Sequence, residues 1–166
     1  NKSETAEQSG DVVEAKKQLL KAKEAIDIAA ANPETEKSPK TLFYKGEIYT
    51  KMTFFKILGD AEFNKNVPEN AKEISIKAYK EAYDISNKYD SDIQNSVNVI
   101  KQMLYTAGSA AFDAKKYKEA TMAFGTVNDY TGILITLINK FCFVLFILSY
   151  SNEYWIRLYH ITQVPF

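Results

Sequence analysis

The chain contains few of the residues on which catalytic and metal sites depend. Its 166 residues include one cysteine, Cys142, and one histidine, His160, which excludes an internal disulfide and a metal site built on several Cys or His side chains. Cys142 and His160 could serve as nucleophile and base. However, Cys142 lies in an apolar run that would bury the thiol and disfavour its reactive thiolate, so a structural cysteine is the favoured interpretation. No glycine-rich phosphate loop occurs either.

Glycine and acidic residues are also missing where a cation site would need them. Asp90 and Asp92 could open a calcium loop, but the position reserved for glycine holds Asn95 and the closing position holds Lys101 instead of Glu. We therefore interpret this segment as a turn and helix cap. No pair of carboxylates suggests a hydrolase or a small-ligand site. We expect a protein that is not an enzyme, with no catalytic residue, no metal and no cofactor.

An excess of charge of either sign is absent. Lys plus Arg and Asp plus Glu number 21 each, so the formal net charge is zero and we expect no nucleic-acid partner. Only 6 Gly and 4 Pro are few for a β protein with many tight turns. Hydrophobic residues make up 46% of the chain, which is enough for one domain with a core and too many for disorder throughout.

Composition changes near residue 131. Residues 1–130 contain no Arg, Cys, Trp or His, whereas the stretch from Ile133 to Leu148 is almost entirely apolar. We therefore divide the chain into a disordered or frayed N-terminus at 1–10, a helical body at 11–130 and a hydrophobic C-terminal segment at 131–166. The first residue is Asn1 and no signal peptide follows it, so we expect an exported protein whose signal peptide has been removed, with a cytoplasmic location as the alternative.

The body carries apolar residues at helical spacing. No run before residue 150 alternates with a period of two, so the predicted class is all-α. Asp11 and Glu14 form a capping-box pattern at the start of the first helix. The predicted helices lie between Asp11 and Asn32, between Pro39 and Gly59, between Pro68 and Ile85, between Ile93 and Ala111, and between Tyr117 and Val127, with a loop at Asp60–Val67.

The last two predicted helices carry a finer pattern of large and small residues. Gly108 and Ala120 are small where two helices would cross closely, and Tyr117 and Phe124 are large enough to fill the gaps to neighbouring helices. The pattern resembles the tetratricopeptide repeat (TPR), a pair of antiparallel helices of about 34 residues. The residues that carry the resemblance are Leu104, Ala107, Gly108, Ala111, Phe112, Tyr117, Ala120, Phe124 and Val127.

A second, weaker copy precedes this one. Its first helix carries Leu42, Gly46 and Tyr49, and its second helix carries Ser75, Tyr79 and Ala82, although the join is about seventeen residues longer than in the family. A third trace, Ala22, Ile26 and Ala29, resembles a lone second helix. The resemblance implies antiparallel helix pairs stacked as a short right-handed solenoid, an irregular and incomplete array.

What the resemblance implies about function is a binding role. Proteins of this family are non-catalytic adaptors or scaffolds, and their first helices line a groove for a peptide or a partner protein. One subgroup grips a terminal carboxylate with Lys and Asn; those positions here hold Phe, Glu, Tyr and Ser, so that clamp is not expected. Position by position, the groove-facing candidates are Lys40, Phe43, Glu47, Thr50, Lys51, Gln102, Tyr105, Ser109, Phe112 and Asp113.

Three interpretations compete for the C-terminal segment. It could cap the last repeat, since a solenoid end needs a cover. It could anchor a membrane-tethered scaffold or assembly subunit through residues 133–150, with Trp155 and Arg157 at the interface and Lys140 as a cost. It could also be a tail that is not native to the repeat protein and reflects a shift of reading frame or a truncation. An uncovered end repeat would favour pairing of two copies.

Overall fold

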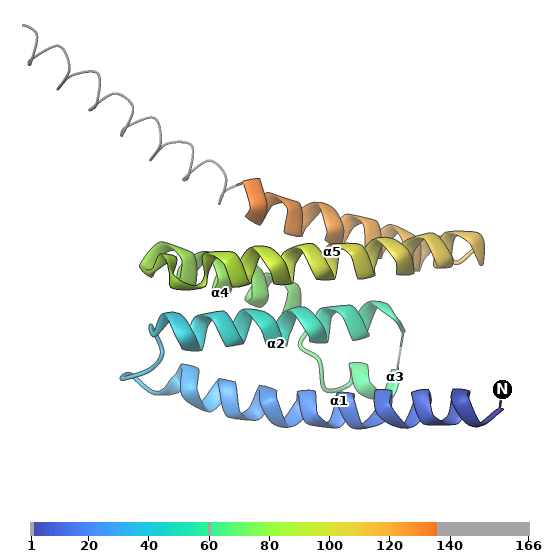
Figure 1. Cartoon of the computed structure of the whole chain (residues 1–166), viewed down its shortest axis with the longest axis horizontal. Coiled ribbons are helices and arrows are strands. Elements are labelled where there is room, and N and C mark those ends of the chain that lie inside the picture. Colours follow the sequence, from blue (N-terminus) through green and yellow to red (C-terminus); the bar gives the residue numbers. More distant parts are fainter. Residues whose placement is uncertain (1, 60, 136–166) are drawn as a thin grey trace, which may run out of the picture. The chain divides into compact units, whose positions relative to one another are not determined.

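A computed structural model describes residues 2–59 and 61–135, which form only helices and connecting turns (Figure 1). No strand occurs in these two stretches, so the predicted all-α class is confirmed for the described chain. Residues 117–135 are helical and follow α5. The labelled elements are α1 (Lys2–Ala31), α2 (Pro39–Ile57), α3 (Ala61–Asn64), α4 (Ala71–Ile85), the 3-10 helix η1 (Asn87–Tyr89) and α5 (Asp90–Asp113).

The observed helices differ from the sequence prediction at the start of α1, at the start of α4, which begins at Ala71 and not at Pro68, and in the predicted loop after α2. α1 begins at Lys2, so the Asp11 capping-box pattern lies inside the helix and does not start it. The fraying expected for residues 1–10 stays a prediction. The predicted loop at Asp60–Val67 contains the short helix α3, because Phe63 and Val67 are buried and draw this segment onto the core. The segment at residues 61–67 therefore packs as part of the fold.

The other helix ends follow from local chemistry. Pro39 stands in the first turn of α2, where its missing N–H costs nothing. Gly59 follows α2 with a φ of +82°, a conformation that glycine adopts without steric penalty. Asp90 and Asp92 lie in the first turn of α5, where their negative carboxylates interact favourably with the positive end of the helix dipole. These turns separate helices long enough to pack side by side.

The central helix of the packing is α2, which contacts α1, α4 and α5. Its Tyr49 and Met52 are buried in a cluster with Leu19 and Ile26 of α1 and with Phe63. On the other side, α5 buries one stripe at the helical spacing that the sequence predicts. That stripe consists of Ile93, Val97, Ile100 and Leu104, each at most 5% exposed. One face of α5 is therefore core, which leaves its other faces free to form a surface.

The C-terminal predictions fall largely outside the described residues. The chain up to Ile133 forms one compact unit, and a second begins at Leu134. Cys142, His160 and residues 136–166 are not described, so the cap, the anchor over 133–150 and the non-native tail all stay predictions. Among the helices of residues 2–59 and 61–135, none combines the length and the apolar character that a membrane span requires.

Candidate functional site

Two glycines mark close crossings between helices. A Cβ atom added to Gly46 of α2 would lie 2.5 Å from Cε1 of Tyr79 on α4. A Cβ added to Gly108 of α5 would lie 2.9 Å from Cε1 of Phe124 in the helix at 117–135. The same added Cβ would lie 3.2 Å from Cβ of Ala123. Each glycine thus lets an aromatic ring from the next long helix approach the helix backbone.

The residue three positions before each glycine touches the same ring. Phe43 precedes Gly46, and its ring centroid lies 6.4 Å from that of Tyr79. Tyr105 precedes Gly108, and its ring centroid lies 5.7 Å from that of Phe124. The pair formed by α2 and α4 is therefore built like the pair formed by α5 and the helix at 117–135, despite the long insertion in the first pair.

The other residues of the repeat pattern, which we expected to pack between helices, fall into two groups. Leu42, Tyr49, Ala82, Leu104 and Ala120 are buried, each at most 6% exposed. Tyr117 is 57% exposed, and its ring packs edge-on against Phe112, with centroids 5.6 Å apart. In the described chain, Tyr117 therefore lies at the surface of the second pair.

Buried tyrosine hydroxyls connect the helices. The Tyr79 hydroxyl donates to Oε1 of Glu47 at 2.6 Å, and the Tyr130 hydroxyl donates to Oγ1 of Thr50 at 3.2 Å and lies 2.6 Å from Oγ of Ser75. Burial raises the pKa of both phenols above the ordinary value of 10.0, so both are neutral near pH 7. The helix at 117–135 is thereby joined to α2 and α4.

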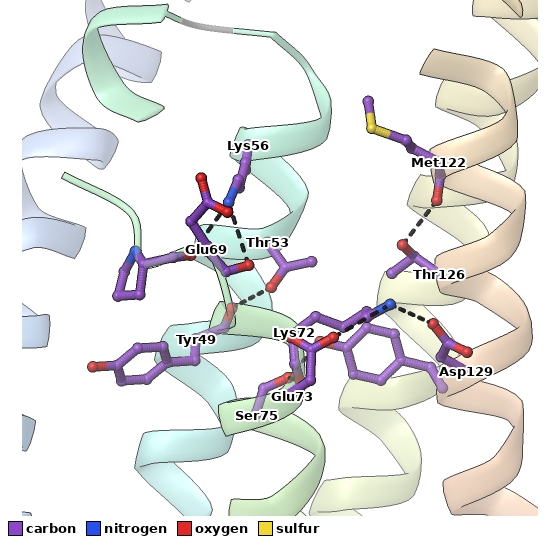
Figure 2. Close-up of polar contacts among 12 residues, drawn as sticks. Tyr49, Thr53, Lys56, Glu69, Lys72, Glu73, Ser75, Met122, Thr126 and Asp129 are labelled. Atoms are coloured by element: carbon purple, nitrogen blue, oxygen red, sulfur yellow. Dashed lines mark hydrogen bonds and ion pairs between the residues drawn. The ribbon is translucent and has the colours of Figure 1, made fainter. Parts of the chain in front are cut away.

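An ion pair lies beside this network at the surface. Figure 2 shows Lys72 of α4 pointing towards Asp129 of the helix at 117–135, close to Ser75. Its Nζ lies 2.6 Å from Oδ2 of Asp129 and 3.7 Å from Oε1 of Glu73. The hydrogen bond with Asp129 raises the pKa of Lys72 more than any other interaction. Because both side chains are partly exposed, we expect the pair to orient the helices more than to stabilise them.

The equivalent helices α2 and α5 border a groove. Its larger hollow has a volume of about 1260 Å³, and a smaller hollow of about 310 Å³ adjoins it; Asn95, Val99 and Met103 line both. Phe54 of α2 and Val127 supply further apolar surface to the larger hollow. The polar side chains of that hollow are Asn95, Asn98, Lys101, Gln102, Tyr105 and Thr106. It is therefore an open site that is mainly uncharged.

The structure brings five of the ten groove candidates to this groove. Glu47, Thr50 and Lys51 line the smaller hollow, and Gln102 and Tyr105 line the larger one. Near the smaller hollow, Nζ of Lys51 lies 3.9 Å from Oε2 of Glu47, which partly balances its charge. The Glu47 carboxylate also accepts a hydrogen bond from the Tyr79 hydroxyl of α4, and this bond fixes the orientation of the carboxylate.

The other five candidates lie elsewhere. Phe43 is buried, because the ring of Tyr89 stacks on it with centroids 4.9 Å apart. Phe112 is 57% exposed on α5, beside Tyr117 and away from the lining of either hollow. Lys40, Ser109 and Asp113 do not line these hollows either.

Sequence reasoning missed the residues that form the floor of the groove. Val99 and Met103 are 56% and 42% exposed, although both are large and apolar. They repeat at a spacing of four along α5, next to the buried stripe, and Asn95, Asn98 and Gln102 flank them. A second apolar row outside the core stripe was the signal that could have identified this face.

Within residues 2–59 and 61–135, no group of His, Cys, Asp and Glu is placed to hold a metal ion. Comparison with protein-family models, with curated proteins and with solved structures finds no match to this chain.

Proposed function

We propose that this chain is a short TPR-like right-handed solenoid that acts as a non-catalytic adaptor and binds an extended peptide of a partner protein. The observation that carries the proposal is the groove between α2 and α5, the first helices of two pairs built around Gly46 and Gly108. First helices that together line one groove are the arrangement by which helical-repeat proteins bind peptides. The proposal concerns the groove and rests on no residue beyond Ile135.

The chemistry of the groove favours a peptide backbone as its occupant. Asn95, Asn98 and Gln102 lie on α5 at spacings of three and four, so their carboxamides follow one line along the helix. Each carboxamide carries both donors and an acceptor, which matches the alternating C=O and N–H groups of an extended chain. A hollow with Lys101 as its one charged lining residue offers no clamp for a phosphate or a carboxylate.

Apolar side chains of the peptide would be held by the groove floor. Val99 and Met103 form that floor, and Phe54 and Val127 border it. Methionine is flexible and polarisable, so a floor of this kind adapts to more than one apolar side chain. The volume of about 1260 Å³ also exceeds the roughly 300–1,000 Å³ of small-molecule sites. We therefore expect a peptide of several residues with one or two apolar anchors.

The test is selection of peptides from a library displayed on phage, followed by fluorescence anisotropy with the selected peptide. Replacement Asn98→Ala should weaken binding by about tenfold, the loss expected for one or two hydrogen bonds. Met103→Asp should weaken it more, because a carboxylate would stand on the apolar floor. The matched control is Asn128→Ala, which removes an exposed carboxamide outside the lining of the groove.

Two results would contradict the proposal. One is a library that yields no peptide bound by the folded chain. The other is a selected peptide whose affinity is as strong for Asn98→Ala and Met103→Asp as for Asn128→Ala, because such a peptide binds at another surface. Circular dichroism of each variant should show unchanged helix content, since all three side chains are exposed.

A further inference from the structure

Four aromatic side chains are exposed on one face of the second helix pair. Tyr105 and Phe112 lie seven residues apart on α5, and Tyr117 and Phe124 lie seven residues apart in the helix at 117–135. Residues seven apart share one face of a helix. The rings meet in pairs across the two helices, Tyr105 with Phe124 at 5.7 Å and Phe112 with Tyr117 at 5.6 Å. We call these four residues the aromatic face.

In the first helix pair, the positions equivalent to Tyr105 and Phe124 are buried. Phe43 and Tyr79, which correspond to Tyr105 and Phe124, are 9% and 0% exposed. The Tyr89 ring of η1 covers Phe43, and α5 packs against α2. In the second pair, Tyr105 is 62% exposed and Phe124 36%. Within residues 2–59 and 61–135, the same structural position is therefore covered in one pair and open in the other.

We propose that the aromatic face is the interface through which two copies of this chain pair about a twofold axis. In the first pair the Tyr89 ring of η1 stacks on Phe43, and the aromatic face of a second copy would present the same kind of ring to Tyr105. Tyr and Phe rings pair favourably with one another in offset or edge-on geometry, and none of the four side chains is charged. Twofold pairing through one self-complementary patch is the commonest arrangement among soluble oligomers.

The exposed area is consistent with a dimer interface. At roughly 150–250 Å² for each aromatic side chain, the four exposed fractions amount to about 400 Å² for each copy. Two copies would bury about 800 Å² through these rings alone, so the proposed dimer requires flanking residues of the same helices to add at least about 400 Å² to reach the roughly 1,200–2,000 Å² typical of stable interfaces. The aromatic face shares Tyr105 with the lining of the peptide groove, and its other three residues lie outside that lining.

The experiment is sedimentation equilibrium of the full chain over a series of concentrations. The wild-type chain should have the mass of a dimer. Phe112→Glu and Tyr117→Glu should each raise the dimer dissociation constant at least about 30-fold, as expected at the centre of an interface. Ile28→Glu is the matched control, since it adds the same charge at a side chain of α1 that is 73% exposed.

Each outcome decides the proposal. A monomeric wild-type chain would overturn it, as would a dimer that persists in both Glu variants, because that dimer would use another surface. Should a Glu variant lose its helix content, Phe112→Ala and Tyr117→Ala replace it, and they should weaken the dimer in the same direction. An Ile28→Glu chain that dissociates like the other two would also count against the aromatic face.

Discussion

At the scale of single residues, three buried tyrosines each place a hydroxyl beside an acceptor on another helix. Tyr49 of α2 donates to Asp27 of α1, and Tyr79 of α4 donates to Glu47 of α2. Tyr130 donates to Thr50 of α2. A buried hydroxyl without a partner would be costly, so each tyrosine favours one arrangement of its two helices over alternatives that are packed equally well. Apolar contacts alone would define these arrangements less sharply.

The stability of the fold should fall at alkaline pH because of these phenols. Burial, with Glu47 nearby, raises the pKa of Tyr79 above its ordinary 10.0. The unfolded phenol ionises near pH 10, whereas the folded one stays protonated, so ionisation favours the unfolded chain. The contribution of Tyr79 is complete below pH 10 and is lost as the pH rises towards its folded pKa. Urea titrations at pH 8 and at about pH 11 should show this loss.

Tyr79→Phe separates this effect from the titration of lysines. The variant should lose about 1.5–3 kcal/mol at pH 8, because it lacks a hydrogen bond to a carboxylate, and should then lose less than the wild-type chain between pH 8 and 11. Lysines titrate in both proteins, so they cancel in the difference. Equal losses in the two proteins over that range would show that Tyr79 does not control the alkaline response.

At the scale of helices, the two glycine crossings differ in how well they tolerate a larger residue. Tyr79, which faces Gly46, is fully buried and is held by Glu47. Phe124, which faces Gly108, is 36% exposed and can turn away into solvent. The ring contact is therefore rigid in the first pair and adjustable in the second, where the buried Cβ of Ala123, 3.2 Å from the added Cβ, still requires a small shift.

Alanine at the two glycines should have different effects. Gly46→Ala should lower the free energy of unfolding by about 1–3 kcal/mol, since overpacking against Tyr79 outweighs the gain in helix propensity. Gly108→Ala should lie within about 1 kcal/mol of wild type. Gly125→Ala is the control; nothing lies within 4 Å of its added Cβ, so it should stabilise the chain by about 0.5–1 kcal/mol. Thermal and urea unfolding would measure all three, and a Gly46→Ala chain as stable as Gly125→Ala would refute the close crossing.

Helix positions could be predicted from the sequence where the signal was local. Pro39 and the aspartates at 90 and 92 indicated helix starts, and the stripe from Ile93 to Leu104 identified the buried face of α5. The helix α3 was missed because its four residues form too short a segment for periodicity to be recognised. Its Phe63 becomes significant only once the chain folds back onto α1 and α2.

At the scale of the molecule, the two proposed surfaces should be separable. The peptide groove depends on Met103 and Asn98, and the aromatic face depends on Phe112 and Tyr117. Met103→Asp should therefore weaken the peptide and leave the dimer mass unchanged. Phe112→Glu should give monomers whose peptide affinity is within about twofold of wild type, because Phe112 packs on Tyr117 and does not line the groove. Anisotropy and sedimentation on the same samples test this, and loss of both properties in both variants would show a single shared surface.

The sequence by itself determined the class of the protein and the buried faces of its helices. Helical periodicity and capping are local properties, so Ile93, Val97 and Leu104 indicated a core face without knowledge of their neighbours. Only the tertiary structure decided which of the remaining faces are open. Phe43 and Tyr105 occupy equivalent positions, yet one is covered by Tyr89 and the other is exposed. The apolar row at Val99 and Met103 could indicate an additional face of α5, but exposure depends on elements distant in the chain, so the row could not show whether that face is open.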